Sequence, residues 1–195
     1  MHFHEDKALK LPCDDGFRYR YSDEFVSDEE RDTSLHWEIG QERDQSTYYI
    51  HGAMHIFSDG SDIEKLSYSN VGLPLAFQVK KSIEKDRFPV FISEGTTEHK
   101  LARIKRNGYL SRTFSSLKNI KGNLFIFGHS IRDEDDHVFD FINHNNKSLN
   151  IYISLYGGVN DEHNQVIISK VNGWRRKYPG KIIEFYDSAT VKVWG

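Results

Sequence analysis

The chain has 195 residues, of which 28% are charged, and a formal net charge of −3 at pH 7. Its basic residues are scattered rather than gathered into a patch, which argues against a nucleic-acid partner. A single cysteine, Cys13, excludes an internal disulfide and a multi-cysteine zinc site, and no run resembles a signal peptide or a membrane span. We therefore predict a soluble, cytoplasmic protein with one globular domain over residues 1–195 and no membrane partner.

The first quarter of the chain has few features that specify structure. Residues 1–46 are polar and acidic, and we predict that they are irregular. Tyr48 to Ile50 then reads as a buried strand that ends in the pair His51-Gly52, and residues 53–57 continue extended to a hairpin-type turn at Asp59-Gly60.

Two histidines in this stretch invite a metal interpretation. His51 and His55 have the i, i+4 spacing of helical zinc ligands, but in an extended chain that spacing separates them by roughly 13 Å. A shared metal ion is therefore disfavoured, and no metal is expected. His51 is either a single catalytic or hydrogen-bonded residue or a buried structural histidine, and the sequence leaves both possibilities open.

The middle of the chain alternates helical and extended patterns. Residues 74–85 form an amphipathic pattern that begins at a proline, residues 90–92 read as a short buried strand, and residues 96–107 and 109–120 read as helices. Glu94 lies at the junction between that strand and the next helix. It could meet a ribose hydroxyl or orient His51, or it could serve only the helix N-terminus.

The stretch around residue 128 organises the second half. Leu124 to Phe127 suits a strand covered on both faces, and Gly128 permits a sharp turn into a helix that opens with the acidic run 133–136. Because ligands bind at the carboxyl ends of parallel strands, we expect Gly128, His129 and Ser130 to lie at a crevice, with Asp133 at the helix start.

Two more strands follow, residues 151–155 and 182–186, with a helix between them that begins at Asn160 or Asp161. The alternation of strands and helices predicts an α/β fold with a mainly parallel, Rossmann-like sheet flanked by helices.

Three strings together resemble an uncharacterised bacterial domain family that is related to sirtuin-like NAD-consuming domains. They are YYIHGAMHIF (48–57), PVFISEGT (89–96) and FIFGHSIRDEDDH (125–137). The resemblance implies a sirtuin-like fold in which His51 acts at the nicotinamide ribose, while Gly52, Glu94, Gly128, His129, Ser130 and Asp133 contact the cofactor.

The same resemblance implies segments that are not found in this sequence. A Gly-rich phosphate loop and a string with a catalytic asparagine are expected upstream of the His-Gly pair, so the chain is expected to correspond to the C-terminal portion of such a domain. An upstream polypeptide or a second copy of the chain is then the expected partner. The four-cysteine zinc module of sirtuin deacylases has no counterpart, so protein deacylation is not expected.

Three functions remain open. The first is an NAD glycohydrolase or a portion of one, and the resemblance adds a possible role in bacterial anti-phage defence. The second is a non-catalytic module for nucleotide sensing or oligomerisation. The third is metal-dependent hydrolysis through His129, Asp133 and His137. The first predicts that His51 and Ser130 open onto one crevice at the carboxyl ends of neighbouring parallel strands.

Overall fold

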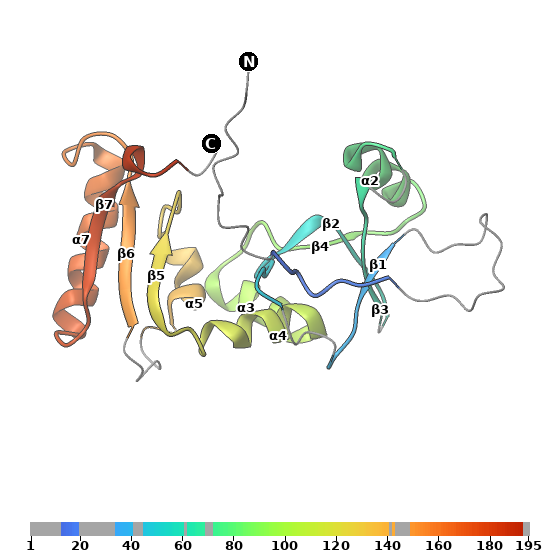
Figure 1. Cartoon of the computed structure of the whole chain (residues 1–195), viewed down its shortest axis with the longest axis horizontal. Helices are drawn as coiled ribbons and strands as arrows, with labels where there is room; N and C mark the ends of the chain where they lie inside the picture. The colour runs from blue at the N-terminus through green and yellow to red at the C-terminus, as the bar shows by residue number, and fades with distance from the viewer. Residues whose placement is uncertain are drawn as a thin grey trace, which may run out of the picture. The chain divides into compact units, whose positions relative to one another are not determined.

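A computed structural model describes most of the chain. The described residues are 13–19, 34–40, 45–60, 62–68, 72–140, 142 and 149–192. They form a mixed α/β fold with a four-stranded antiparallel sheet and a three-stranded parallel sheet (Figure 1). The fold divides into two compact units: the first ends at Ser93 and also takes in Ile104–Thr113, and the second comprises Glu94–Arg103 and the residues from Phe114 onward. The single domain over residues 1–195 stays a prediction.

The first unit is built on the antiparallel sheet, which has the order β1-β3-β2-β4. Its strands are β1 (Leu35–Trp37), β2 (Gly52–Asp59), β3 (Asp62–Lys65) and β4 (Pro89–Phe91). Our prediction that residues 1–46 are irregular was wrong at β1, which pairs with β3. Strand β1 has only three residues, and its ladder partner lies far along the chain, so no local pattern marks it.

The predicted strand from Tyr48 to Ile50 was also wrong. The backbone there bonds to side chains and to a turn instead of a ladder: the Tyr49 N–H donates to the Tyr109 hydroxyl at 3.2 Å, and the Gly52 N–H donates to the Tyr49 carbonyl at 2.9 Å. The strand begins at Gly52. His51 therefore precedes a strand, and both neighbours of that strand run antiparallel to it.

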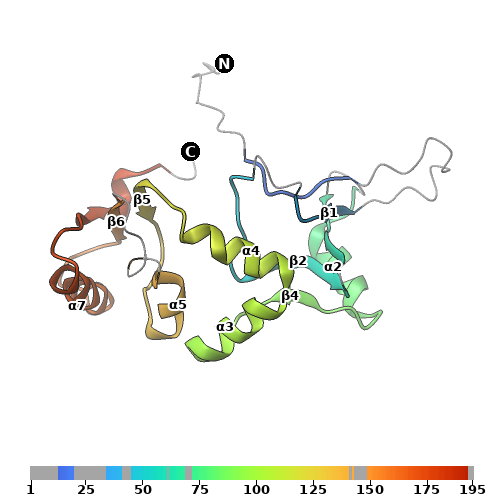
Figure 2. The ribbon, with the colours of Figure 1, turned by 90° about the horizontal axis from the view of Figure 1, so that it is seen from below.

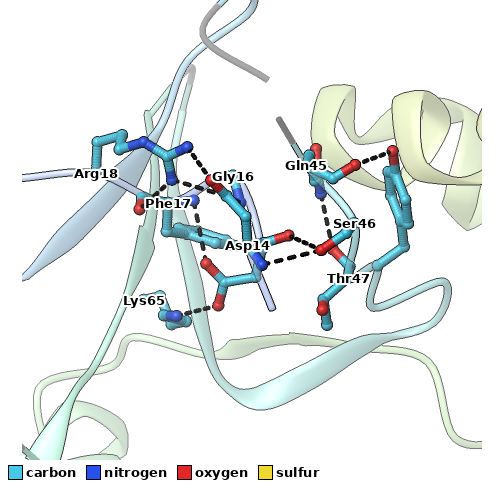
Figure 3. Close-up of polar contacts among 10 residues, drawn as sticks. Asp14, Gly16, Phe17, Arg18, Gln45, Ser46, Thr47 and Lys65 are labelled. Carbon is cyan, nitrogen blue, oxygen red and sulfur yellow. Dashed lines mark hydrogen bonds and ion pairs between the residues drawn. The ribbon is translucent and has the colours of Figure 1, made fainter. Parts of the chain in front are cut away.

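Polar contacts fasten the start of the described chain to the segment before β2 (Figure 3). The Asp14 carbonyl accepts from the Ser46 and Thr47 N–H groups at 2.7 and 2.8 Å, and Asp15 forms an ion pair with Lys65. Aromatic rings fill the space beneath these contacts. Tyr109, which is fully buried, contacts the rings of Phe17 and Trp37 at centroid distances of 5.2 and 5.4 Å.

Helix α2 (Leu75–Ile83) forms where its pattern predicts, after Pro74, but apolar residues of that pattern are not the ones that are buried. The buried residues are Gln78 and Ser82, while Leu75 and Ile83 are exposed. The buried Gln78 side chain donates to the Leu73 carbonyl at 2.7 Å, so a polar residue with a local hydrogen bond faces inward. Spacing alone identified the helix but not the side that packs.

The second unit is built on a parallel sheet, as the alternating pattern predicts, with the strand order β5-β6-β7. The strand predicted at residues 90–92 belongs to the antiparallel sheet instead. These are β5 (Gly122–Ile126), β6 (Leu149–Leu155) and β7 (Ile183–Asp187). The 3-10 helix η1 (Asp133–Asp135) and α5 (Asp136–Phe139) follow β5, α7 (Glu162–Lys177) follows β6, and η2 (Ser188–Thr190) follows β7. Helices α3 (Thr97–Arg106) and α4 (Gly108–Leu117) contribute residues to both units.

One face of the parallel sheet packs against the helices. Ile151, Ile153 and Ile183 are buried with Ile167 and Val171 of α7. Figure 2 shows α5 and α7 on the same side of β5 and β6. Among the described residues, no helix is long and apolar enough to cross a membrane.

Side chains on the other face of the sheet are exposed, so the expectation that Leu124 to Phe127 is covered on both sides was wrong. Phe125 is 62% exposed and stacks on Tyr152 of the neighbouring strand, with 4.9 Å between the ring centroids. Phe127 is also exposed. The apolar run was correctly identified as a strand, but two of its rings face outward.

Candidate functional site

In the first unit, the pair His51-Gly52 is fixed by its backbone. Gly52 has a φ of +74°, and a Cβ at this position would lie 1.8 Å from the Val90 carbonyl oxygen. Glycine is therefore required here by the close approach of β4. The His51 carbonyl accepts from the Ile92 N–H at 2.9 Å, and the residue is half-buried. These contacts hold the His51 backbone in one conformation at the start of β2.

In the second unit, Gly128 makes the turn that follows β5. Its φ is +67°, and its N–H donates to the Ser154 hydroxyl of β6 at 3.0 Å. That bond ties the carboxyl ends of two parallel strands together. It also occupies the backbone donor that would otherwise be available to a nucleotide. Ser130, two residues further on, is exposed.

His129 stabilises the loop that contains it. Its Nδ1 accepts from the Ile131 N–H at 2.9 Å, its ring lies edge-on to Phe139, and its Nε2 is 3.7 Å from Asp135 Oδ2. Because Nδ1 is the acceptor, the ring is neutral with its proton on Nε2. Burial lowers the pKa of His129, and the Asp135 charge offsets this only in part. Neutral His129 therefore stabilises the loop by accepting the Ile131 N–H.

Ile131 has a backbone conformation that is unusual for its residue type. Its φ is +51°, and its side chain is fully buried in the core beneath the sheet. A β-branched residue in the left-handed region is a conformational outlier. The His129 bond and the buried side chain hold it from both sides. The loop 128–133, which we call the β5 loop, is therefore strained and rigidly supported.

Two lysines form ion pairs with three of the four carboxylates in the acidic run 133–136. Lys170 of α7 contacts Asp133 at 2.7 Å and Asp136 at 2.5 Å, and Lys100 of α3 contacts Asp135 at 2.7 Å. Hydrogen bonding to Lys170 lowers the pKa of Asp133. Burial lowers the pKa of Lys170, but its bonds to the two carboxylates outweigh burial and raise that pKa. Asp133 therefore shares its charge with Lys170 while its own side chain stays exposed.

An open depression of about 720 Å³ lies between the β5 loop and α7. Its volume is within the range of ordinary ligand pockets. It is lined by Ile131, Arg132, Asp133, Glu134, Glu162, Gln165, Val166, Ser169 and Lys170. Of the predicted site residues, only Asp133 lines it. The lining mixes both signs of charge, which suits a polar ligand with hydroxyl groups better than a simple anion.

The loop after β6 was not singled out as a site by the sequence. Residues 156–159, which we call the β6 loop, are held by side chains from the start of α7. Asn164, fully buried, donates to the Tyr156 and Gly158 carbonyls at 3.0 and 2.8 Å, and Asp161 accepts from the Gly158 N–H at 2.8 Å. Gln165 donates to the Val159 carbonyl at 2.7 Å. The signal that could have found it is Tyr-Gly-Gly at the end of a strand, followed by several amide and acidic side chains.

Two other predicted roles can be compared with the geometry. Glu94 is exposed in a bend before α3, while the Thr96 hydroxyl accepts from the His99 N–H at 3.4 Å. Thr96 is thus the residue that caps the helix, as its sequence position predicts. Among the described residues, His129, Asp133 and His137 are not found as a group whose ligand atoms could share one metal ion, and Asp133 is turned to Lys170.

The predicted site residues therefore belong to two groups. Gly128, His129, Ser130 and Asp133 lie together in the β5 loop and at its end, at the carboxyl edge of the parallel sheet. His51 and Gly52 lie at the start of β2 in the first unit. The expectation that His51 and Ser130 both lie at the carboxyl ends of neighbouring parallel strands was wrong, because His51 precedes β2, and β2 belongs to the antiparallel sheet. A crevice that contains both residues stays a prediction.

Comparisons with known proteins identify the family. No curated protein and no solved structure matches the chain. A family described as Domain of unknown function (DUF4917) matches residues 9–194, which is nearly the whole chain. The chain belongs to the DUF4917 family.

Proposed function

We propose that this protein binds NAD, or a dinucleotide of the same class, at the carboxyl ends of β5 and β6. The observation that carries the proposal is the strained backbone at Ile131, whose φ is +51° in the loop that follows the parallel strand β5. Strain of this kind costs about 1–3 kcal/mol and persists where the surroundings enforce it, often at ligand sites. In parallel α/β sheets this edge is the usual place for a nucleotide.

The surrounding contacts favour binding over hydrolysis by the β5 loop itself. His129 uses Nδ1 to hold the Ile131 N–H, and Asp133 and Asp135 are paired with lysines. A general base needs a lone pair or carboxylate that can take a proton near neutral pH. The β5 loop offers exposed Ser130 and the shared carboxylate of Asp133, which suit hydrogen bonds to ribose hydroxyls.

NAD hydrolysis is the second candidate function. It assigns the base at the nicotinamide ribose to His51, and it is supported by the fixed backbone of His51 next to an obligatory glycine. This proposal also includes a relationship to sirtuin-like domains and a Rossmann-like classification of the parallel sheet. It further includes a cytoplasmic location and a role in anti-phage defence. A second copy of the chain or another polypeptide would supply a catalytic asparagine to that site.

Titration calorimetry of the full chain with NAD and with ADP-ribose tests the binding proposal. Saturable binding of both ligands is expected. Ser130→Trp should abolish it by filling the edge of the β5 loop. Asn119→Trp is the matched control, because Asn119 is also exposed and uncharged but lies in the turn before β5, at the opposite end of that strand. If the unsubstituted chain does not bind NAD, the proposal is refuted. If the two variants bind NAD equally well, the β5 loop is not part of the binding site.

A further inference from the structure

Tyr156 has an unusual setting at the end of the central strand of the parallel sheet. It follows the last residue of β6, and its side chain is 77% exposed, more than any other aromatic side chain that the structure describes. An aromatic side chain this exposed leaves apolar surface in water with no packing gain from its own chain. At the edge where we propose that the ligand binds, an exposed ring is placed to stack on another aromatic group.

The backbone that presents this ring is held rigidly. The Tyr156 carbonyl accepts from Asn164 Nδ2 at 3.0 Å and lies 3.1 Å from His163 Nε2. Gly157 has a φ of +81°, and a Cβ there would lie 2.7 Å from Asp161 Oδ2, so the turn closes tightly onto α7. A surface loop held by this many side-chain bonds loses little conformational entropy when a ligand binds.

We propose that Tyr156 is a stacking platform for the adenine base of the bound dinucleotide. This inference rests on the proposed function. The β5 and β6 loops follow neighbouring parallel strands, which are joined by the Gly128–Ser154 bond, so both lie at one edge of the sheet. The β5 loop would then bind the ribose hydroxyls of the ligand, and the Tyr156 ring in the β6 loop would bind its adenine base.

Stacking on an aromatic ring suits adenine for a physical reason. A base stacked on an aromatic side chain contributes about 1–3 kcal/mol, and the contact needs no hydrogen-bond readout. The purine ring offers a larger π-face than nicotinamide. The platform therefore recognises the adenosine end, and the class of ligand is an adenine dinucleotide rather than a nicotinamide mononucleotide.

Substitution of Tyr156 can be separated from effects on folding. The loop is held through backbone atoms of residues 156–159, so a change of the Tyr156 side chain leaves those bonds in place. Tyr156→Phe keeps the ring, and Tyr156→Leu keeps apolar bulk but removes the π-face. Tyr68→Leu is the matched control, because Tyr68 is 61% exposed in the first unit.

The test is calorimetric titration of the full chain and these three variants with NAD, AMP and nicotinamide mononucleotide. Tyr156→Leu should weaken NAD and AMP binding about tenfold or more, while Tyr156→Phe and Tyr68→Leu bind as the unsubstituted chain does. Equal NAD affinity for Tyr156→Leu and the unsubstituted chain would overturn the stacking proposal and leave the NAD proposal standing. A chain that binds neither NAD nor AMP would overturn both.

A fluorescence measurement gives an independent readout. In Tyr156→Trp, the introduced indole should be quenched by AMP when the adenine stacks on it, and nicotinamide mononucleotide at the same concentration should leave it unchanged. Quenching by nicotinamide mononucleotide but not by AMP would show that the ring stacks on the nicotinamide end of the ligand and would overturn the assignment to adenine.

Discussion

Gly52→Ala should break the pairing of β2 with β4. The new methyl group would lie 1.8 Å from the Val90 carbonyl oxygen, which belongs to the backbone and cannot rotate away. Restoring ordinary contact, at about 3.5 Å, requires the strands to separate by about 1.7 Å. That movement would remove the bond from the Ile92 N–H to the His51 carbonyl. A left-handed alanine costs about 1–2 kcal/mol and each lost bond about 1 kcal/mol, so the expected destabilisation is about 3 kcal/mol or more.

Gly128→Ala is the matched control for this substitution. Gly128 also has a left-handed φ, +67°, but a Cβ at that position meets no atom within 4 Å. Only the conformational cost of about 1–2 kcal/mol remains. The two glycines come from the two strings expected to contact the cofactor, so the comparison separates steric need from backbone conformation.

Hydrogen–deuterium exchange of the Ile92 amide measures the local effect directly. Gly52→Ala should speed exchange at Ile92 by a factor of about 100 or more, which corresponds to about 3 kcal/mol. Gly128→Ala should leave that amide unchanged. Urea denaturation of each variant should rank the losses in the same order. A Gly52→Ala chain that loses no more stability than Gly128→Ala would refute the steric reasoning for the His51-Gly52 pair.

Three further predictions concern the two groups of residues. Burial lowers the pKa of His129, so stability is full above the unfolded-state value of about 6.5 and falls as the pH drops below it toward the folded-state pKa. Urea denaturation at several pH values should show a smaller loss in His129→Asn, which can still accept from the Ile131 N–H but does not titrate. Asn164→Ala leaves the Tyr156 and Gly158 carbonyls without their buried donor and should destabilise the chain by about 1–3 kcal/mol in thermal unfolding, with faster exchange confined at first to the β6 loop. The chain alone should turn over fluorogenic NAD slowly or not at all, and robust turnover that survives His51→Ala would contradict both the assignment of His51 and the proposal that another polypeptide supplies the asparagine.

The second half of the fold was predictable because its signals are local. Apolar runs at 124–127, 151–155 and 182–186 alternate with helical patterns, and the parallel sheet follows from that alternation. The turn at Gly128 was also found from its sequence. What the apolar runs could not reveal is that both flanking helices pack on one face and leave Phe125 exposed.

The first unit was less predictable because its pairing depends on distant residues. Tyr48 to Ile50 has the composition of a strand, but a hydroxyl 60 residues away takes its backbone donor at Tyr49. Antiparallel pairing of β2 with β4 likewise depends on which segments meet in space. The pairing of Lys170 with Asp133 was invisible for the same reason, since the residues are 37 positions apart.

The central claim is that a dinucleotide binds at the carboxyl edge of the parallel sheet. Hydrogen–deuterium exchange of the full chain with and without saturating NAD tests it most directly. The account predicts slower exchange in peptides that cover the β5 loop and the β6 loop, with no change in the β2–β3 hairpin around Gly60. Unchanged exchange in both loops at an NAD concentration that saturates the chain would contradict it.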